Sequence, residues 1–428
     1  MDVTKLNNRT DHGKVVMVSN YINHHQIPFC DAMNELLSGA FFFIQTEPME
    51  EERIRMGWQD QVSISYLRKY YEEPEECQKL IDEADWVIFG GTEEESYIQH
   101  RLAQKKPLIR YSERLYKCGQ WKAISPRGLK KKYHDHTRYR KDEVYLLCSG
   151  AYVSSDFHIV RAYPGKMLNW GYFPKTYIYD DFDKLMSSKK PGNIVWAARF
   201  LDWKHPELPL ETAAYLKKQG ISFHLDLIGG GEMEETVQKL YKEYHLEDVV
   251  TLQGYKTPDQ VRDFMKKSEI CLVTSDRNEG WGAVVNEAMN SGCVVVADHL
   301  IGAVPSLIRQ GENGFIYGDG CKDQLFAYTA KLLTDRETCK KMGYAAYKTV
   351  STTWNERQAA LRLLTFAIHK HILSEEDVEM TTQMKKWLGE QDGQMFADGP
   401  CAPAPILSER RMKKRYGSTT DQCDRTGL

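Results

Sequence analysis

Two glutamates, Glu279 and Glu287, stand eight positions apart around a glycine-rich turn. Glu279 lies just before the Gly-x-Gly turn at 280–282, and Glu287 falls about a turn and a half into the helix that this turn should open. A helix N-terminus exposes unpaired backbone N–H groups and a partial positive charge, which favours a phosphate. Carboxylates accept hydrogen bonds from hydroxyls. The segment therefore suits a ligand that is part phosphate and part polyol, as a nucleotide-sugar is.

Two cations precede this segment in the chain. Arg199 and Lys204 follow the apolar run Ile194–Ala197, where the loop at a strand end can direct both into a crevice. Fixed positive charge beside a departing diphosphate stabilises the transition state more than the ground state, which is what catalysis requires. The alternative for Lys204 is a surface position at the start of the helix expected over His205–Gln219.

Short apolar runs alternate with helical spacing, and these elements must position the charged residues. The expected strands are Val15–Ser19, Ala40–Thr46, Trp86–Phe89, Leu108–Tyr111 and Val144–Cys148 in the first half, then Ile194–Ala197, Phe223–Ile228, Val249–Leu252, Ile270–Thr274 and Val294–Ala297. Near-continuous apolar strands between helices indicate parallel sheets covered on both faces. The expected fold class is α/β, with two Rossmann-like, doubly wound domains and a ligand cleft between the carboxyl ends of their strands.

The length of 428 residues favours two domains of ordinary size. The polar stretch Tyr179–Gly192 is the expected linker. We therefore expect domains over 1–188 and 189–350, followed by an amphipathic helix over 351–373. Residues 374–428 are expected to form a flexible extension, because the Pro-rich run Gly399–Pro405 cannot hold a helix.

The order of these residues resembles the signature of the group-1 (family-4) glycosyltransferases. The resemblance rests on Glu279-x7-Glu287, on Gly292 and Gly311-x-Asn313-Gly314 after them, and on Arg199 and Lys204 before them. The resemblance is close over about residues 190–350. In the first half it extends only to the alternation of expected strands and helices. It implies a retaining enzyme of the GT-B fold, with an acceptor-side first domain, a nucleotide-sugar donor domain, and a C-terminal helix that crosses back to the first domain.

The resemblance also implies the roles of individual residues. Glu279 would hold sugar hydroxyls, Glu287 the ribose hydroxyls, and Arg199 with Lys204 the donor diphosphate. The glycine-rich loop would bring Gly280 and the backbone amides of Trp281, Gly282 and Ala283 to the phosphates or the sugar. Gly229 and Gly230 would form a turn that faces the diphosphate. The same glycines could instead suggest a dinucleotide site, but the third glycine of that fingerprint is absent, so nicotinamide binding is disfavoured.

The first half contributes a loop and a strand end. The loop Ser19–Pro28 lacks the Gly-Gly pair of many family members and instead resembles a polysaccharide-biosynthesis subset with an Asn-His-His-Gln loop. His24 and His25 are candidates to bind acceptor or phosphate; the alternative is that one of them caps the following helix. Glu113 follows the expected strand Leu108–Tyr111 and stands either beside donor and acceptor or in a structural ion pair.

No metal site and no cofactor beyond the nucleotide-sugar donor, a UDP- or GDP-sugar, is expected. Asp181-Phe182-Asp183 has the form of a metal-binding DxD, but it falls in the expected linker and not at a strand end. His134 and His136 lack the further Cys or carboxylate partners of a zinc site.

Composition restricts the partners. The balance of 57 basic against 60 acidic residues disfavours a nucleic-acid binder. The absence of a long apolar run, of a secretory leader and of CxxC motifs among the ten cysteines favours a cytoplasmic protein. The basic stretch Arg127–Lys141 is either a solvated helix face or a docking patch at an anionic membrane surface, which would place the chain peripherally at the inner membrane face.

The sequence thus predicts a retaining glycosyltransferase that moves a sugar from a nucleotide-sugar to a glycan or lipid-linked oligosaccharide acceptor in polysaccharide biosynthesis. Two alternatives remain. A non-catalytic nucleotide-sugar-binding subunit would bind donor without releasing nucleoside diphosphate. A glycoside hydrolase would need its two carboxylates on either side of one bond, which two positions on one loop and helix do not easily provide.

Overall fold

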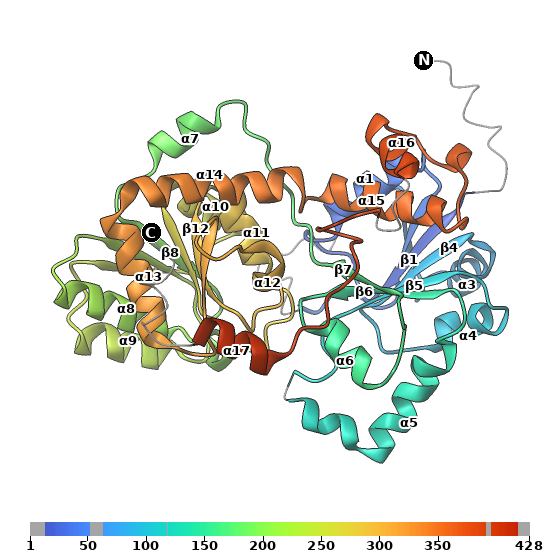
Figure 1. Ribbon diagram of the computed structural model, residues 1–428, viewed down its shortest axis with the longest axis horizontal. Coiled ribbons are helices and arrows are strands. Elements are labelled where there is room, and N and C mark those ends of the chain that lie inside the picture. Colours follow the sequence, from blue (N-terminus) through green and yellow to red (C-terminus); the bar gives the residue numbers. More distant parts are fainter. Residues whose placement is uncertain (1–12, 52–62, 118, 391–394, 418–428) are drawn as a thin grey trace.

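The computed structural model describes residues 13–51, 63–117, 119–390 and 395–417, and these residues form two parallel sheets (Figure 1). The first sheet has the strand order β3-β2-β1-β4-β5-β6-β7, and the second has the order β10-β9-β8-β11-β12-β13. The strands of the first sheet are β1 (Val15–Ser19), β2 (Phe41–Gln45), β3 (Leu67–Lys69), β4 (Trp86–Phe89), β5 (Leu108–Ser112), β6 (Val144–Ser149) and β7 (Met167–Trp170). Those of the second are β8 (Asn193–Ala197), β9 (His224–Ile228), β10 (Val250–Gly254), β11 (Ile270–Val273), β12 (Val294–Asp298) and β13 (Gly314–Tyr317).

Helices separate the strands in both halves. In the first half they are α1 (Ile27–Leu36), α3 (Pro74–Glu83), α4 (Ser96–Ala103), α5 (Pro126–Asp135) and α6 (Val153–Ile159). In the second half they are α8 (Glu207–Lys218), α9 (Glu234–Glu243), α10 (Pro258–Lys267), α11 (Ala283–Asn290), α12 (Val304–Leu307), α13 (Lys322–Thr334) and α14 (Arg336–Thr352). Every residue of β1, β4, β11, β12 and β13 is buried, as a parallel sheet covered on both faces requires. The predicted fold class, two doubly wound α/β sheets, is confirmed.

The strand orders place the predicted site residues at the points where the winding direction reverses. In the first sheet β1 lies between β2 and β4, and in the second β8 lies between β9 and β11. Open α/β sheets bind ligands in the crevice outside the carboxyl ends of such strands. The loop after β1 carries His24 and His25, and the loops after β8 and β11 carry Arg199 and Glu279.

The segment between the two sheets is not a structureless linker. It contains α7 (Phe182–Ser188), which Asp181 caps by accepting a hydrogen bond from the Lys184 amide at 2.8 Å. The predicted boundary between residues 188 and 189 falls at the end of this helix. The ring of Phe182 stacks on Tyr347 of α14 at 3.8 Å between centroids, so α7 is anchored to the second half of the chain.

After α14 the chain returns to the first half. Helix α15 (Glu356–His369) packs on α1, and the side chain of Asn355 caps it by accepting from the Gln358 amide at 2.8 Å. Figure 1 shows α14 over the second sheet and α15 over the first. The helix is shorter than the predicted range 351–373, because α14 continues to Thr352 and a turn intervenes.

Residues 374–390 and 395–417 differ from the expectation of a flexible extension. Helix α16 (Thr382–Gly389) packs on α15, and helix α17 (Glu409–Gly417) lies against the second half near β13. Between them the Pro-rich segment runs antiparallel to β7, where the Cys401 and Ala404 amides donate to the carbonyls of Asn169 and Met167 at 2.8 and 2.9 Å. The Pro-rich run cannot form a helix, but an extended edge segment suits it. The predicted extension beyond residue 417 lies outside the described residues. Within the described residues, no helix has the length and apolar character needed to cross a membrane.

Candidate active site

A cavity of about 570 Å³ lies between the carboxyl ends of the two sheets. It is lined by loops from both halves of the chain. Among the predicted site residues, those that line it are His24, His25, Glu113, Arg199, Lys204, Gly229, Glu279, Trp281, Gly282, Ala283 and Glu287. Gly230 and Gly280 do not line it but lie directly behind its wall. The structure therefore brings together side chains that are up to 263 positions apart, from His24 to Glu287 (287 minus 24).

Lys204 and Glu279 are in direct contact inside the cavity. The Lys204 ammonium donates to Glu279 Oε2, and their side chains are only 14% and 12% exposed. Lys204 also lies 4.2 Å from the centroid of the Trp203 ring. Because the pair is shielded from solvent on several sides, both charges are held in fixed positions. The alternative placement of Lys204 on the surface is wrong.

The second glutamate-bearing element starts at the cavity wall. Helix α11 begins at Ala283, two residues later than the sequence analysis assumed, so Glu287 lies about one turn into it. Gly282 precedes it with a φ of +88°, and no side chain caps the helix. The first N–H groups of α11 are therefore available to a ligand at the place where Ala283 and Val284 line the cavity.

Glu287 faces the cavity from α11 and is held by an arginine. Its Oε1 lies 3.6 Å from a guanidinium nitrogen of Arg262. The guanidinium carbon of Arg262 lies 4.6 Å from the centroid of the Tyr177 ring. Burial raises the pKa of Glu287, and the Arg262 charge opposes this effect. The carboxylate is thus ready to accept hydrogen bonds, with a countercharge behind it.

The buried side chain of Trp281 holds the loop between Glu279 and α11 in place. It is 1% exposed, its indole N–H donates to the Asn286 amide oxygen at 2.8 Å, and its ring stands 5.6 Å from that of Trp354. A Cβ at Gly171 would collide with this ring. The predicted contribution of Trp281 was its backbone amide; the structure shows that its side chain anchors the glutamate loop to residues near both sheets.

Glu113 reaches across from the first sheet. It accepts hydrogen bonds from the Tyr172 hydroxyl and the Lys117 ammonium, both at 2.6 Å. A Cβ at Gly280 would collide with its carboxylate, which places Glu113 beside the loop of the second half. Glu113 therefore forms the ion pair of one option and also lines the cavity, while its place beside donor and acceptor stays a prediction.

His24 and His25 form part of the cavity wall opposite Arg199. Their rings lie 3.9 Å apart between centroids, and both are half-buried. Helix α1 begins after Gln26 and has no side-chain cap, so neither histidine caps it. The Asn23 side chain instead shapes the turn by accepting from the His25 amide at 3.0 Å. Arg199 is half-buried and lies two residues after the end of β8.

The glycine turn after β9 packs against the loop that carries Arg199. Gly229 has a φ of +146°, and a Cβ there would collide with the Ala198 carbonyl oxygen. A Cβ at Gly230 would meet the Tyr255 ring at 2.6 Å. Gly229 therefore forms the cavity wall, and Gly230 sits behind Tyr255.

Several lining residues were not predicted from the sequence. Tyr172, Tyr111, Tyr255 and Trp203 are the aromatic members of this group outside the loop Ser19–Pro28, which also contributes Tyr21. The Tyr111 hydroxyl lies 2.5 Å from that of Ser19, which fixes it beside the histidine loop. Burial and the negative charge of Glu113 raise the pKa of Tyr172, so its hydroxyl remains a donor. Only Tyr111 had a signal in the sequence, as the last residue of an expected strand.

The alternative metal motifs have other contacts. Asp181 caps α7, and Asp183 accepts from the Tyr344 hydroxyl at 2.5 Å. His136 lies 2.8 Å from the Tyr163 hydroxyl, and burial lowers its pKa well below the usual value. Among the residues that the structure describes, no group of three or more His, Cys, Asp or Glu is placed to hold a metal ion.

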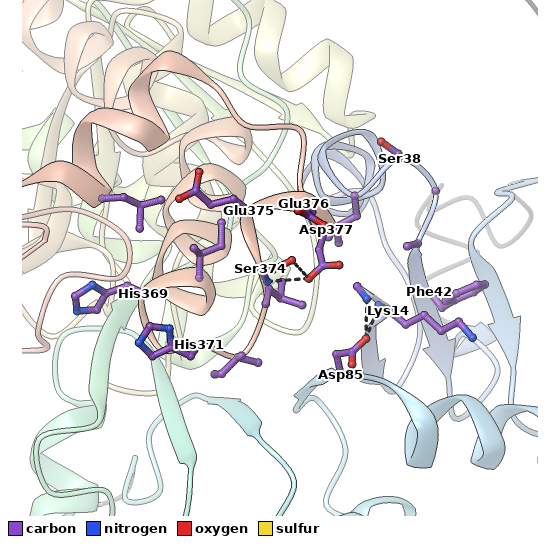
Figure 2. A pocket seen from close by; sticks show the side chains of 18 residues that line it. Lys14, Ser38, Phe42, Asp85, His369, His371, Ser374, Glu375, Glu376 and Asp377 are labelled. Carbon is purple, nitrogen blue, oxygen red and sulfur yellow. Dashed lines mark hydrogen bonds between the residues drawn. The ribbon is translucent and has the colours of Figure 1, made fainter. Parts of the chain in front are cut away.

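A second cavity, of about 1210 Å³, lies at the opposite edge of the first sheet (Figure 2). Lys14 and Asp85, which line it, immediately precede β1 and β4. Figure 2 shows Asp85 bonded to the backbone of Lys14, and Asp377 bonded to Ser374. It lies at the amino ends of parallel strands, where such sheets do not bind their ligands. It contains none of the predicted site residues, so we assign the chemistry to the smaller cavity.

Comparisons with known proteins agree with this geometry. A sequence model of glycosyl transferases group 1 matches residues 179–349. The amylovoran biosynthesis glycosyltransferase AmsK of Erwinia amylovora is 27% identical over 179 residues, which are 41% of this chain and 44% of that protein. The chain thus spans less than half the length of the relatives of this kind that it matches.

Solved structures match over more of the chain. Anabaena HepE in complex with UDP-glucose has a TM-score of 0.57 at 12% identity, covering 82% of this chain and 99% of HepE. The sucrose-phosphate synthase of Thermosynechococcus elongatus has a TM-score of 0.58 at 14% identity, covering 84% and 99%. These likenesses show that the fold is GT-B. The range that matches the model of glycosyl transferases group 1, residues 179–349, contains Arg199, Lys204, Glu279 and Glu287.

Proposed function

We propose that the chain transfers a sugar from a nucleotide-sugar donor to a glycan or lipid-linked acceptor in the cavity between its two sheets. The observation that carries the proposal is the single cavity in which Lys204, Arg199 and the uncapped start of α11 meet Glu279 and Glu287. This combination offers positive charge for a diphosphate and carboxylates for two sets of hydroxyls.

The donor would lie along α11. Glu287, backed by Arg262, would accept hydrogen bonds from the ribose hydroxyls, and Glu279 would accept them from the sugar. Arg199, Lys204 and the first amides of α11 would hold the diphosphate between them, with Gly229 allowing close approach. In this arrangement Lys204 touches both Glu279 and a phosphate oxygen, so it links the sugar end of the donor to its leaving group.

The proposed reaction retains the configuration of the sugar. The bond between the anomeric carbon and the phosphate oxygen breaks, and the acceptor oxygen forms its new bond on the same face. The departing phosphate oxygen takes the proton of the acceptor hydroxyl, so no protein nucleophile is needed. Arg199 and Lys204 stabilise the charge that grows on the leaving group. Glu113, His24 and His25 face the same space from the first sheet and would orient the acceptor.

The polysaccharide pathway is supported by the relatives. AmsK is named for amylovoran biosynthesis, and the solved HepE structure contains UDP-glucose. We infer by this similarity that the donor is a UDP- or GDP-sugar and that the product belongs to a polysaccharide.

Two other functions are less well supported. A glycoside hydrolase needs two carboxylates on either side of one bond. Here Glu279 is held by Lys204 and Glu287 by Arg262, at two places along one loop and helix. A non-catalytic sensor would use the same donor contacts, but it has no need for a cation fixed against the sugar-binding carboxylate.

The test is a thermal-shift panel of nucleotide-sugars, followed by measurement of nucleoside diphosphate release from the best binder. Each cation should make charge-assisted bonds worth about 1.5–3 kcal/mol, or roughly ten- to hundred-fold in rate. Lys204→Ala and Arg199→Ala should each lose that much, and Arg199→Lys should not fully recover it, because an ammonium lacks the planar fork. Lys322→Ala, which removes a surface ion pair with Glu211, is the matched control and should keep full turnover.

Binding of a donor without release of nucleoside diphosphate would favour the non-catalytic subunit. We further expect turnover to persist in excess chelator, because the proposed countercharge comes from side chains. Activity that vanished with chelator and returned with manganese would contradict this part of the proposal.

A further inference from the structure

Helix α5 (Pro126–Asp135) exposes its large apolar side chains to solvent. None of its residues is buried. Its half-buried positions are Gly128, Lys132 and Asp135, which share the face turned to the protein at helical spacing. Burial lowers the pKa of Lys132, in agreement with this inward placement. Lys132 and Asp135 thus lie on the face turned to the protein, whereas Leu129 and Tyr133 lie on the face turned to solvent.

The outward face carries large apolar side chains. Leu129 is 42% and Tyr133 is 56% exposed, and their spacing of four places them side by side. Ile124, just before the helix, is 79% exposed. A short helix with no buried apolar stripe is marginally stable in water unless a further contact covers it. Concentrated exposed apolar side chains of this kind mark an interaction surface.

The same segment is strongly basic in a chain whose formal net charge is −3. Residues 127–141 contain a single acidic residue, Asp135, and seven basic ones: Arg127, Lys130, Lys131, Lys132, Arg138, Arg140 and Lys141. Lys131 is the member that pairs with acids, at 3.9 Å from Glu93 and 3.8 Å from Asp135. Lys130 neighbours Tyr133 on the outward face, so positive charge and apolar surface are interleaved.

We propose that this surface, the α5 face (Ile124, Leu129 and Tyr133 with Arg127, Lys130 and Lys131), docks reversibly on a bilayer that contains anionic phospholipids. The apolar side chains would enter the boundary between headgroups and acyl chains, while the basic side chains contact the lipid phosphates. The contact goes beyond sugar transfer, because it needs neither donor nor acceptor.

A membrane fits this face better than a protein partner does. The helix is about 15 Å long, whereas a specific protein interface buries about 800 Å² on each partner. Three exposed apolar side chains beside the exposed Arg127, Lys130 and Lys131 of the same helix offer a small apolar area and an excess of positive charge. That composition matches an anionic, deformable surface.

Along the chain, α5 follows the segment that leaves the cavity. Glu113, which pairs with Lys117, is the cavity-lining residue that precedes α5 in the chain. The chain then passes through the short 3-10 helix Gln120–Ile124 into α5. The start of α5 therefore follows the carboxyl end of β5, the edge of the sheet that faces the cavity. A bilayer contacted here would lie next to the acceptor side. This last step rests on the proposed function.

The experiment is co-sedimentation of the full chain with vesicles, without any nucleotide-sugar. Vesicles of phosphatidylcholine alone are compared with vesicles that also contain phosphatidylglycerol. Binding should require the anionic lipid and weaken as salt is raised. Lys130→Gln with Lys131→Gln should weaken it about thirty-fold, from roughly fivefold per lysine near the surface. Leu129→Ser with Tyr133→Ser should weaken it by about tenfold.

The matched control is Lys340→Gln with Lys341→Gln, a pair of adjacent exposed lysines on α14. This variant should bind vesicles as the unmodified chain does. Melting curves of all variants check that the fold is intact. Equal loss of binding in both lysine pairs would overturn the proposal, because any positive charge would then suffice. Failure to bind anionic vesicles, or a Leu129/Tyr133 variant that instead changes the oligomeric state, would overturn it as well.

Discussion

At the scale of single residues, each carboxylate of the cavity is held by a cation from another position. The pairs are Glu113 with Lys117, Glu279 with Lys204, and Glu287 with Arg262. Removing either member of a shielded pair leaves the other charge without compensation and is costly, so the stability of each variant is measured beside its activity. Each carboxylate keeps further oxygen lone pairs that a hydroxyl group can use.

The two donor-side glutamates should separate nucleotide binding from transfer. Glu287→Ala should weaken binding of free nucleoside diphosphate by about ten- to hundred-fold, because its proposed partner is the ribose. Glu279→Ala should leave this affinity nearly unchanged and lower transfer. Calorimetric titration with the diphosphate measures the first effect, and its release from the donor measures the second. Glu211→Ala, which breaks a surface pair, is the control. The reverse pattern would show that the two roles are exchanged.

Glu287 also predicts a pH dependence. Burial raises its pKa, so it takes up a proton at a higher pH than an ordinary glutamate does. Since a protonated carboxyl is a poorer acceptor for ribose hydroxyls, nucleotide affinity should be highest above this raised pKa and fall as the pH drops through it. The comparison of the chain with Glu287→Gln, titrated with the same diphosphate, isolates this step from the titration of the phosphate. A profile that is identical in the two proteins would contradict the assignment.

The sequence identified the charged residues of this site but not the aromatic ones. Glutamates, an arginine and a lysine at fixed spacing resemble a known signature, so Arg199, Lys204, Glu279 and Glu287 could be predicted. Tyr172 and Tyr255 carry no such signal, because their place in the cavity depends on how the two halves meet. Glu113 was predicted only as one of two options, and its contact with Gly280 could not be known without the packing.

At the scale of elements, the site depends on the loop that turns into α11. Gly282 has a φ of +88°, and a Cβ there would meet Ile301 at 2.8 Å. Gly282→Ala should cost about 1 kcal/mol of stability or more through the left-handed backbone, and should displace the loop between Glu279 and α11. We expect a clear loss of donor binding in a thermal-shift titration.

Gly311→Ala is the matched control for this change. Gly311 has a φ of +77° in the same half of the chain, but a Cβ there would meet nothing within 4 Å. It should lose similar stability and keep donor binding. If both variants bound the donor equally well, the position of the α11 start would not matter as proposed.

The elements that the sequence predicted best are the buried central strands. Ile270–Thr274 and Trp86–Phe89 match β11 and β4 to within one residue, because strands covered on both faces are apolar throughout. The strands β3, β7 and β13 were not predicted, and all three lie at sheet edges. No residue of β3 and only two residues of β7 are buried. Strand β7 is completed by the segment around Pro403, far along the chain, which a local pattern cannot indicate.

At the scale of the whole molecule, the chain crosses between its two halves more than once. After α15 and α16 on the first half, α17 returns to the second (Figure 1). Met412 of α17 is 7% exposed and packs with Ala151 and Tyr152, while Lys413 bonds to Asp319 at 2.6 Å. At the first residue of α17, Glu409 bonds at 2.5 Å to Arg114, the neighbour of Glu113. Helix α17 thus touches both halves near the cavity.

Met412→Ser should therefore release α17 from the body of the molecule. The expected result is faster hydrogen exchange of the α17 amides and a lower melting temperature, because a buried apolar side chain is replaced by a polar one. Lys414→Ser, an exposed position on the same helix, is the control and should leave exchange unchanged. Equal protection of α17 in all three proteins would mean that Met412 does not hold it.

The central claim is sugar transfer from a nucleotide-sugar in the cavity that contains Lys204, Glu279 and Glu287. Its most direct test is proton NMR of the chain with the nucleotide-sugar that binds best, followed in real time with water as acceptor. The account predicts that nucleoside diphosphate and free sugar appear together, and that the first-formed sugar has the anomeric configuration of the donor. A donor that binds but releases no diphosphate, or a first-formed sugar of the opposite configuration, would contradict it.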